Sequence, residues 1–453
     1  MPYPIASLFN GAMDVFIQSR RYRPSRACGG AAQRCRDAMT LMLTHRGDPA
    51  PLIARALADD PCCIEAHCLR IALIITADDD RARSTLAESI GAIEASTAEN
   101  DPARRHARAA RAWLDREPTR ALERYGAIVI ADPHDILALC VAHALDFRLG
   151  RRTMLRDRVA QVLPEWDARD EHCASVLAMY AFGLEENGEY RNAEKIARRA
   201  LTIDPMHLGA VHVVAHVMEM QGRAREGLAF LAETEAAWPA GAGFSIHLAW
   251  HRALFHIDAD DPIAALAVHD DVIANARPSI SVLADASALL WRLELLGIEA
   301  GARWNALADR WEAHDLSAAR PFFIVHAIMA FAWAGRTHAA ARAFDALRRV
   351  QAGAMPAPEE EALAAPLTEA FIAFAHDDYA ACIDWLVKVR HIADRCGGSV
   401  AQCDLIHLTY TEAALRAQAD ALARALVAER TALKPKSRLN RRFEQRLRRK
   451  QAA

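Results

Sequence analysis

The sequence contains no uninterrupted apolar run that approaches the length of a membrane span, and no basic start followed by a long apolar segment. It therefore predicts neither a transmembrane helix nor a signal peptide. The ten cysteines form no CxxC pair and no zinc-finger spacing with histidine. This distribution predicts buried free thiols in a reducing compartment, because free cysteine is among the most buried residue types. We expect a cytoplasmic protein that makes no contact with membranes.

Neither sign of charge dominates. The 55 Lys and Arg nearly balance the 58 Asp and Glu, for a formal net charge of -3, which excludes a general attraction to nucleic acid. Glycine and proline are few and β-branched runs are scarce, whereas alanine is abundant throughout. Because alanine favours helices and β-branched residues favour strands, an all-α protein is predicted. A chain of 453 residues exceeds a single globular core, so it forms several domains or a repeat array.

A period of 34 residues runs through the middle of the chain, from Gly188 to Gly222 and from Pro205 to Pro239. In "AFGLEENGEYRNAEKIARRALTIDP", residues 181–205, a glycine, a turn tyrosine, three alanines and a proline fall at the offsets of tetratricopeptide repeats. The glycine ends the first helix, the alanines let two helices approach closely, and the proline ends the second helix. About ten helix pairs account for nearly the whole chain. This predicts an all-α tetratricopeptide-repeat superhelix, or α-solenoid.

Two segments interrupt or end the array. The stretch "QAGAMPAPEEEALAAP" around residue 356 is typical of a linker, so we expect a superhelix at 1–355 and helix pairs that continue it at 356–453. The basic tail "KPKSRLNRRFEQRLRRK" is compatible with binding to nucleic acid or an acidic partner. However, Leu439, Phe443 and Leu447 recur every four residues. This spacing favours an amphipathic helix that docks as a cap on the solenoid.

Beyond the repeat pattern, the sequence resembles the tetratricopeptide repeat protein 38 family. The resemblance rests on blocks that occur in order, among them "AHALDFRLG", "VHVVAHVMEMQGR", "HLAWHRALFHID", "DASALLWRLELLG", "GGSVAQCDLI" and "ERTALKPKS". It implies the repeat fold but no particular reaction. The chain departs from the family pattern at Leu248, Phe323, Ile324, Val400 and Cys403, where relatives carry Asn, Asp or Arg. These changes beside the kept histidines predict a pocket that differs from that of the relatives.

The helix predicted in "AVHVVAHVMEMQGR", residues 210–223, carries His212, His216 and Glu219 at spacings of four and three residues. These spacings place the three side chains on one stripe of the helix. In the repeats that the chain resembles, the second, fifth, ninth and twelfth positions of the first helix line the concave surface. Counted from Leu208, the stripe takes the fifth, ninth and twelfth positions. We therefore expect it to face the groove.

Inner helices of neighbouring units present more polar and aromatic side chains to the same space. The expected acid–base residues are His212, His216, Glu219, His247, His251 and His326. The expected substrate-binding residues are Glu186, Trp250, Asp285, Ser287, Trp291, Arg292, Cys403 and Asp404. Each histidine taken alone is also compatible with a core role, bonded to a neighbouring carbonyl. The convergence of several favours a ligand site, because each buried polar group needs its own partner.

The sequence favours a pocket without metal or other cofactor. "HVVAH" lacks the glutamate beside the first histidine that zinc hydrolases of the HExxH type use as their base. In a metal-free pocket, imidazoles near carboxylates move protons close to neutral pH. A divalent transition metal is the open alternative, and its ligands would then be His212, His216, Glu219 and His247.

The segment "GGSVAQCD" offers Ser399 and Cys403 as nucleophiles. We favour a structural role for Ser399, because a serine followed three residues later by Gln402 forms a helix capping box. The two glycines do not form a phosphate loop, since neither Lys-Ser nor Lys-Thr follows them.

These patterns predict a superhelix whose concave His/Glu/Asp pocket binds a small polar molecule and transforms it by acid–base chemistry. The alternative is a non-catalytic adaptor that holds a peptide or partner protein in the groove. Peptide grooves usually carry Lys, Arg and Asn to clamp carboxylates and amides. Histidine, glutamate and tryptophan take the inner positions here, which favours the pocket and hence an enzyme. An oligomer is compatible with the sequence.

Overall fold

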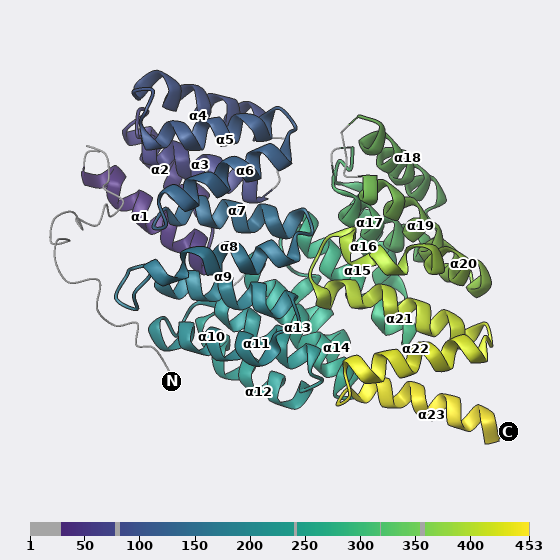
Figure 1. Ribbon diagram of the computed structural model, residues 1–453. Helices are drawn as coiled ribbons and strands as arrows, with labels where there is room; N and C mark the ends of the chain where they lie inside the picture. Colours follow the sequence, from purple (N-terminus) through teal and green to yellow (C-terminus); the bar gives the residue numbers. More distant parts are fainter. Residues whose placement is uncertain (1–28, 78–81, 240–241, 318, 354–357, 453) are drawn as a thin grey trace, which may run out of the picture.

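The computed structural model describes residues 29–77, 82–239, 242–317, 319–353 and 358–452. All regular secondary structure in these residues is helical. Twenty-two of the α-helices form consecutive antiparallel pairs, and a last helix, α23, follows them (Figure 1). The chain is therefore the all-α superhelix of helix pairs that the sequence predicts, with eleven pairs among the described residues rather than ten.

Each pair contributes an inner, odd-numbered helix, which packs on the inner helices of its neighbours, and an outer, even-numbered helix. The first six pairs are α1 (Gly29–Thr44) and α2 (Ala50–Asp59), α3 (Ile64–Ala77) and α4 (Arg83–Ser96), α5 (Pro102–Leu114) and α6 (Pro118–Ala131), α7 (Ile136–Arg148) and α8 (Arg152–Val162), α9 (Cys173–Glu186) and α10 (Tyr190–Ile203), and α11 (Leu208–Met220) and α12 (Ala224–Thr234). The rest are α13 (Gly243–Asp258) and α14 (Pro262–Val268), α15 (Ile280–Leu295) and α16 (Ala302–Glu312), α17 (Pro321–Trp333) and α18 (Thr337–Gly353), α19 (Pro358–Ala375) and α20 (Tyr379–Val389), and α21 (Val400–Arg416) and α22 (Asp420–Leu433), followed by α23 (Arg438–Ala452).

The turns within pairs explain the repeat period. Gly188 and Gly222 end inner helices with φ of 77° and 66°, a left-handed conformation that glycine adopts without strain. These two turns are 34 residues apart, as the sequence predicts. Gly297 and Gly335 occupy the same place in later pairs and are 38 residues apart. The period therefore lengthens toward the C-terminus because the helices and loops there are longer.

Small residues allow the helices of a pair to pack closely. Ala193, Ala197 and Ala200 on α10 have no exposed surface, and α10 packs along α9. The outer helix ends at Ile203, two residues before Pro205, which cannot continue it. The alanine and proline positions thus act as the repeat pattern predicts.

The superhelix closes on itself at its C-terminal end. The helix α21 packs against α11 and α15, and α23 packs against α13 (Figure 1). Polar contacts link these distant segments: the Val400 N–H donates to Glu186 Oε1 at 3.1 Å, and Ser437 Oγ–H donates to Asp258 Oδ1 at 2.5 Å. The C-terminal helices therefore cover part of the concave side, which encloses space that an open solenoid would leave as a groove.

The core is continuous across the expected boundary at residue 356, which itself lies outside the described residues. One hydrophobic cluster includes Phe331 of α17 and Leu363 of α19, on the two sides of that boundary. The basic tail forms α23, and its Leu439 and Phe443 are buried in the same cluster. The apolar stripe of the tail is thus used for docking.

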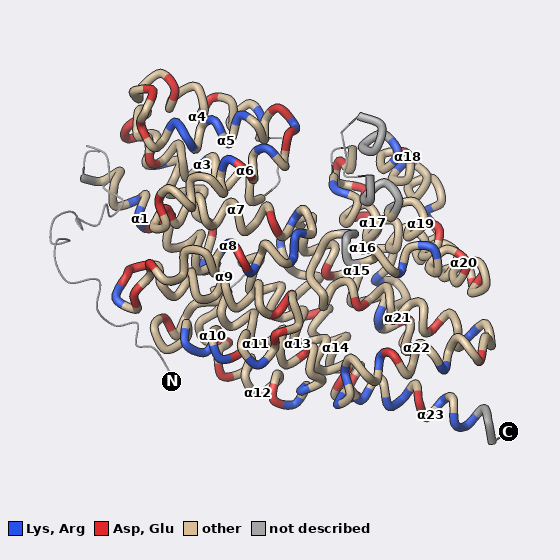
Figure 2. Tube along the Cα trace, in the orientation of Figure 1, with Lys and Arg blue, Asp and Glu red and all other residues tan. Residues whose placement is uncertain are grey.

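Charged side chains concentrate on outer helices and loops, as Figure 2 shows. The outer helix α10 has the sequence YRNAEKIARRALTI, whereas Glu219 is the single charged residue of the inner helix α11, LGAVHVVAHVMEM. This contrast makes the polar residues of α11 conspicuous. Within the described residues, every helix is too short or too polar to cross a lipid bilayer.

Candidate functional site

Four histidine rings from α11 and α13 pack together on the concave side. His212 and His216 lie one turn apart on α11, and His247 and His251 lie one turn apart on α13. A nitrogen atom from each ring lies within 4.8 Å of those from the other three. Nε2 of His212 is 3.2 Å from Nε2 of His247. Two i, i+4 pairs on adjacent inner helices are what brings the four rings together. We call them the histidine cluster.

Carboxylates hold three of the four rings at Nδ1. The pairs are His216 with Glu185 at 3.1 Å, His247 with Asp285 at 2.8 Å, and His251 with Glu219 at 2.9 Å. A carboxylate accepts a hydrogen bond, so each contact places the imidazole proton on Nδ1 and leaves a lone pair on Nε2. The carboxylates come from α9, α15 and α11, so three different helices orient the cluster.

Two of these Nε2 atoms have nothing to bond. Nε2 of His216 and Nε2 of His251 are buried and have no hydrogen-bond partner among the described residues. Both side chains have no exposed surface. A buried polar atom left unpaired costs roughly 1–3 kcal/mol. Sites that keep such atoms need an explanation beyond packing.

Burial sets the protonation of the cluster. Loss of hydration lowers the pKa of His216 to about 4 and, with the charges of the neighbouring rings, lowers the pKa of His212 and His251 well below 6.5. Burial also acts to lower the pKa of His247, but the charge and hydrogen bond of Asp285 outweigh it, so that this pKa is raised. Near neutral pH, at least three of the four imidazoles are therefore neutral and able to donate a lone pair.

Glu185, rather than the expected Glu186, makes the contact with the cluster. Glu186 accepts a hydrogen bond from the Val400 N–H at 3.1 Å and pairs with Arg152 Nε at 3.5 Å. Burial, together with the charge of a nearby carboxylate, raises the pKa of Glu185 and of Glu186 to about 8. The structure thus gives Glu186 a role in holding α21 against α9. Glu185 occupies the twelfth position of its inner helix, so the signal for it was present in the sequence.

A cavity of about 540 Å³ lies beside the cluster on the concave side. Its wall includes His212 and His247, with Asp285 behind them. Most of its lining is apolar, and it contains the aromatic side chains Phe147, Phe182, Phe244, Phe322 and Phe323. Its volume falls in the range of roughly 300–1,000 Å³ that is usual for small-molecule sites. The wall is therefore less polar than the sequence predicts.

Trp250 supports the cluster from behind. Its indole ring is fully buried and stacks on His247, with ring centroids 5.3 Å apart and an interplanar angle of 12°. The Arg292 guanidinium lies over the other ring system at 5.4 Å from the Trp250 centroid. Trp250 was expected to bind substrate, whereas the structure uses it to fix the plane of His247.

Ser287 and Trp291 lie in the core and not at the cavity. Trp291 Nε1–H donates to Thr409 Oγ1 at 3.0 Å, and Ser287 Oγ accepts from Trp311 Nε1–H at 3.0 Å. Both side chains are fully buried. The physical reason is that α21 packs against α15 and covers the face that an open solenoid would expose. The expected substrate contact is replaced by a packing role.

His326 and Cys403 line a separate space of about 20 Å³ behind Phe322. Nδ1–H of His326 donates to the carbonyl oxygen of Phe322 at 2.7 Å, and the Cys403 thiol donates to that of Gly397 at 3.4 Å. His326 is therefore the core histidine of the set, bonded to a carbonyl one turn earlier, and it does not join the cluster.

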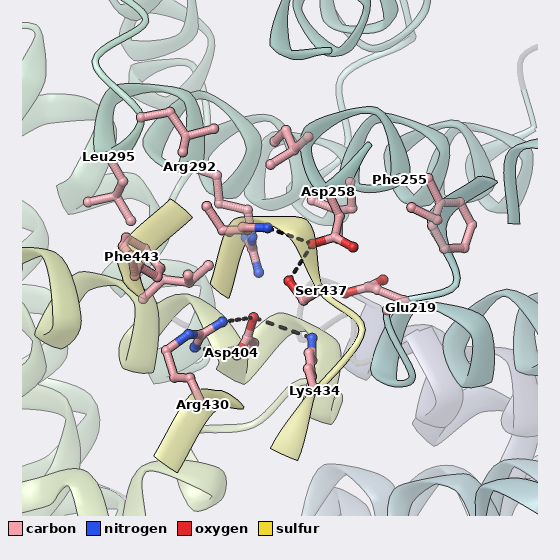
Figure 3. Close-up of a pocket in the computed structure, with 17 residues that line it drawn as sticks. Glu219, Phe255, Asp258, Arg292, Leu295, Asp404, Arg430, Lys434, Ser437 and Phe443 are labelled. Carbon is pink, nitrogen blue, oxygen red and sulfur yellow. Dashed lines mark hydrogen bonds and ion pairs between the residues drawn. The ribbon is translucent and has the colours of Figure 1, made fainter. Parts of the chain in front are cut away.

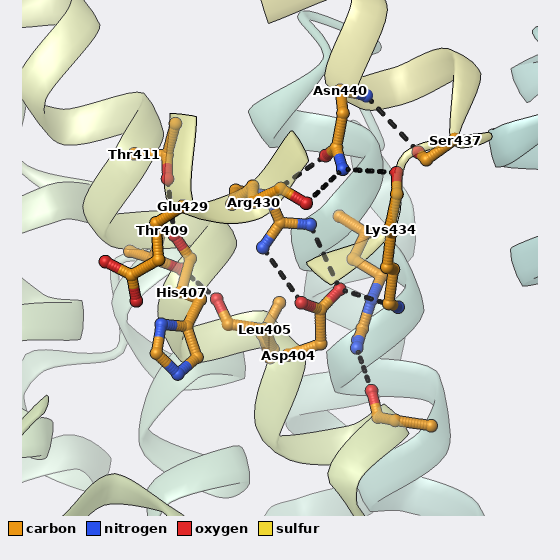
Figure 4. Close-up of polar contacts among 12 residues, drawn as sticks. Asp404, Leu405, His407, Thr409, Thr411, Glu429, Arg430, Lys434, Ser437 and Asn440 are labelled. Carbon is orange, nitrogen blue, oxygen red and sulfur yellow. Dashed lines mark hydrogen bonds and ion pairs between the residues drawn. The ribbon is translucent and has the colours of Figure 1, made fainter. Parts of the chain in front are cut away.

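Arg292 and Asp404 line a third cavity of about 50 Å³, together with Glu219 (Figure 3). Arg292 donates to a backbone carbonyl of α21 at 2.9 Å. Asp404 pairs with Arg430 at 2.8 Å and with Lys434 at 3.4 Å (Figure 4). Burial acts to raise the pKa of Asp404, but the two cations outweigh it and lower that pKa strongly. Asp404 thus ties α21 to α22 and does not reach the large cavity.

The start of α21 forms the predicted capping box. Ser399 Oγ accepts from the Gln402 N–H at 3.3 Å, and Gln402 Oε1 accepts from the Ser399 N–H at 3.0 Å. Both residues line the large cavity. Sequence patterns identified the cap but not this location, because the location depends on how α21 folds back.

Metal-binding capacity lies with the four histidines. Among the described residues, the nitrogen atoms of His212, His216, His247 and His251 form one group of the spacing that a metal ion requires. Glu219, which the sequence placed in such a set, lies behind His251 as its hydrogen-bond partner. Neutral imidazoles suit zinc, iron, copper and nickel, whereas calcium and magnesium prefer oxygen ligands.

No family model matches the chain. Among solved structures, it is similar to the crystal structure of the APC/C hetero-tetramer Cut9-Hcn1, with 12% sequence identity and a TM-score of 0.45. The match covers 92% of this chain and 70% of that one. At this level the likeness carries no inference about function. The repeat fold is established by the helix pairs themselves.

Proposed function

We propose that this chain binds a small organic molecule in the 540 Å³ cavity and acts on it beside the histidine cluster. The observation that carries this proposal is the joining of two features. One is a mostly apolar cavity of ligand size on the concave face, and the other is a set of imidazoles that carboxylates hold in fixed orientations at its wall. Convergent polar groups at an apolar pocket are the usual arrangement of a binding or active site.

The lining indicates the class of molecule. Phe182, Phe244 and Phe322 offer flat apolar surfaces, which suit an aromatic or aliphatic body. His212 and His247 offer hydrogen-bonding nitrogens at one place on the wall. A molecule with an apolar body and one polar group satisfies both. This narrows the small polar molecule that the sequence suggested.

Asp285 and His247 provide the means to act on the polar group. The Asp285 carboxylate holds Nδ1–H of His247 at 2.8 Å, and Trp250 fixes the plane of the same ring. His212 Nε2 lies 3.2 Å from His247 Nε2, so the polar group of the molecule would meet an oriented pair of imidazoles. Pre-orientation of this kind is how active sites gain rate, because the groups need no rearrangement during the reaction.

A cavity-filling substitution tests binding. Ala144 lines the cavity, so Ala144→Phe should occupy the space of the ligand, while Ala131→Phe adds the same ring at an exposed site of α6. Native mass spectrometry of gently purified protein, and thermal-shift screening against molecules of the stated class, should detect a ligand in the wild type and in Ala131→Phe. Ala144→Phe should lose it. A ligand that binds all three proteins equally would place the binding site elsewhere.

The adaptor remains the alternative, and the repeat fold suits it. An adaptor would bind an extended peptide along the concave face, and Ala144→Phe would then leave peptide binding largely intact. Partial coverage of that face by α21 and α23 favours the enclosed molecule. Membership of the tetratricopeptide repeat protein 38 family and a cytoplasmic location remain part of this proposal. All eight cysteines found as free thiols in the described residues are compatible with that location.

A further inference from the structure

We propose that His212, His216, His247 and His251 bind a divalent first-row transition-metal ion, with Zn²⁺ as the reference ion. The proposal concerns the cluster itself and does not depend on what the neighbouring cavity binds. It reverses the preference drawn from the sequence, which lacks the HExxH motif. The reversal rests on contacts between helices that no local motif encodes.

Distances between the rings fit ligands of one ion. Two nitrogens bound to the same ion at about 2.1 Å lie roughly 3.0–3.4 Å apart for angles between octahedral and tetrahedral values. Nε2 of His212 and Nε2 of His247 are 3.2 Å apart. The rings of His216 and His251 complete the group, with centroids 4.6 Å from each other and 4.2 Å and 4.8 Å from His212 and His247 respectively.

The second shell has the form that metal-binding histidines require. Ligand histidines almost always donate Nδ1–H to a carboxylate or carbonyl, which fixes the ring and directs Nε2 to the metal. His216, His247 and His251 each do so, to Glu185, Asp285 and Glu219. A core histidine elsewhere in the chain, His326, donates to a backbone carbonyl of its own helix instead.

Unpartnered atoms point to the same centre. Nε2 of His216 and Nε2 of His251 are buried, carry lone pairs and have no hydrogen-bond partner among the described residues. An ion placed among the four rings would bond to both atoms. It would also compensate the charge of the buried carboxylates behind them, which lie in a region where isolated negative charge is costly.

The ion would be accessible from one side. His212 and His247 border the large cavity, whereas His216 and His251 lie behind them with no exposed surface. His212 is the ring without a carboxylate at Nδ1 among these contacts, so it is the least fixed of the four ligands. A molecule in the cavity would approach the ion past this ring. Open positions of this kind distinguish catalytic metal sites from closed structural ones.

Metal content and affinity test the proposal on the full-length chain. The protein is treated with a chelator, dialysed, and titrated with Zn²⁺ by calorimetry, with content measured by elemental mass spectrometry. We expect one equivalent of Zn²⁺ and a higher melting temperature with the ion present, because an ion that binds only the folded state stabilises it. Failure of the wild type to bind Zn²⁺, Co²⁺, Ni²⁺ or Fe²⁺ would overturn the proposal.

Variants locate the site. His216→Ala and His251→Ala should abolish binding, and Glu219→Gln should weaken it by about 10–100-fold, since it removes the charge behind His251. His326→Ala is the matched control, a buried histidine outside the cluster that should keep full binding. If Ala variants fail to fold, side-chain nitrogen NMR of the wild type replaces them. Zn²⁺ should then shift the resonances of the four cluster rings and leave those of His326 in place.

A second potential site must be separated from the first. Cys35, Cys63 and Glu65 near the N-terminus also have ligand atoms within reach of one ion. The titrations are therefore repeated with Cys63→Ser, which should keep the equivalent that the histidines bind. Loss of all binding in Cys63→Ser, or binding that survives His216→Ala unchanged, would assign the metal to the cysteines and refute the proposal.

Discussion

Substituting Gly183 by alanine should destabilise the protein, because α8 and α9 nearly touch at this point. A Cβ at Gly183 would lie 2.5 Å from Arg156 Cα and 2.6 Å from the carbonyl oxygen of Leu155. Both opposing atoms belong to the backbone of α8, so no side-chain rotation can relieve the overlap. The helices would have to separate by roughly 1 Å to restore ordinary contact in a close-packed interior.

Two terms of opposite sign decide the size of the effect. Alanine is the better helix former and gains about 1 kcal/mol over glycine inside a helix. Overpacking costs about 1–3 kcal/mol and sometimes more, and a clash with backbone belongs at the upper end. We expect a net loss of about 2 kcal/mol in the free energy of unfolding. Phe182 and Glu185 lie on the same helix, so the shift should also displace the cavity wall and the cluster.

Thermal melting followed by far-ultraviolet circular dichroism measures this loss. For a cooperative unit of 150–250 residues, 2 kcal/mol corresponds to roughly 4–8 °C in Tm. Gly91→Ala is the matched control, because Gly91 lies exposed within α4 with no atom within 4 Å of the added methyl group. This control should gain about 0.5–1 kcal/mol. A Gly183→Ala protein that melts at or above the wild-type temperature would show that α8 and α9 do not approach this closely.

Two further predictions concern buried charge. Asp146→Ala leaves the guanidinium of Arg158 buried without the partner it holds at 2.5 Å, so a loss of about 3–5 kcal/mol is expected, whereas Arg342→Ala, which breaks an exposed pair with Glu312, should cost about 1 kcal/mol or less; equal shifts in Tm would contradict the burial of the first pair. Burial lowers the pKa of His207 to about 4, so below about pH 6.5 the unfolded chain binds a proton that the folded chain excludes, and stability falls as the pH drops. Between about pH 7 and pH 5 the wild type should lose about 2 kcal/mol more than His207→Asn, a variant that keeps a capping group without titrating, and parallel pH profiles of Tm would refute this.

The helix pairs could be predicted because their signals are local. A glycine such as Gly188 ends a helix through its own conformation, and alanines such as Ala193 permit close packing wherever the partner helix follows next in sequence. The capping box of Ser399 and the stripe that contains His212 and His216 follow from the same short-range geometry. Features that depend on spacings of three or four residues were therefore accessible from the sequence.

The rest of the site depends on contacts between distant segments. One residue along a helix changes direction by roughly 100°, which separates Glu185, at the cluster, from Glu186, at α21. The return of α21 against α15 buries Trp291 among core side chains. His326 was misplaced for a similar reason, since its helix α17 lies two inner helices away from α13. No periodicity reports how a superhelix closes.

Closure and the histidine cluster depend on the same residues, which argues for a single purpose. Glu219 holds His251 on one side and lines the small cavity with Arg292 and Asp404 on the other. Glu185 holds His216, while its neighbour Glu186 accepts the first amide of α21. A solenoid that only displayed a peptide groove would gain nothing from burying these carboxylates, because each one loses hydration that a surface position would keep. Their burial is balanced if the closed end holds cationic or hydrogen-bonding groups in place beside the cavity. The cluster, the cavity and the C-terminal helices are thus best understood as one unit, with the repeats serving as its frame.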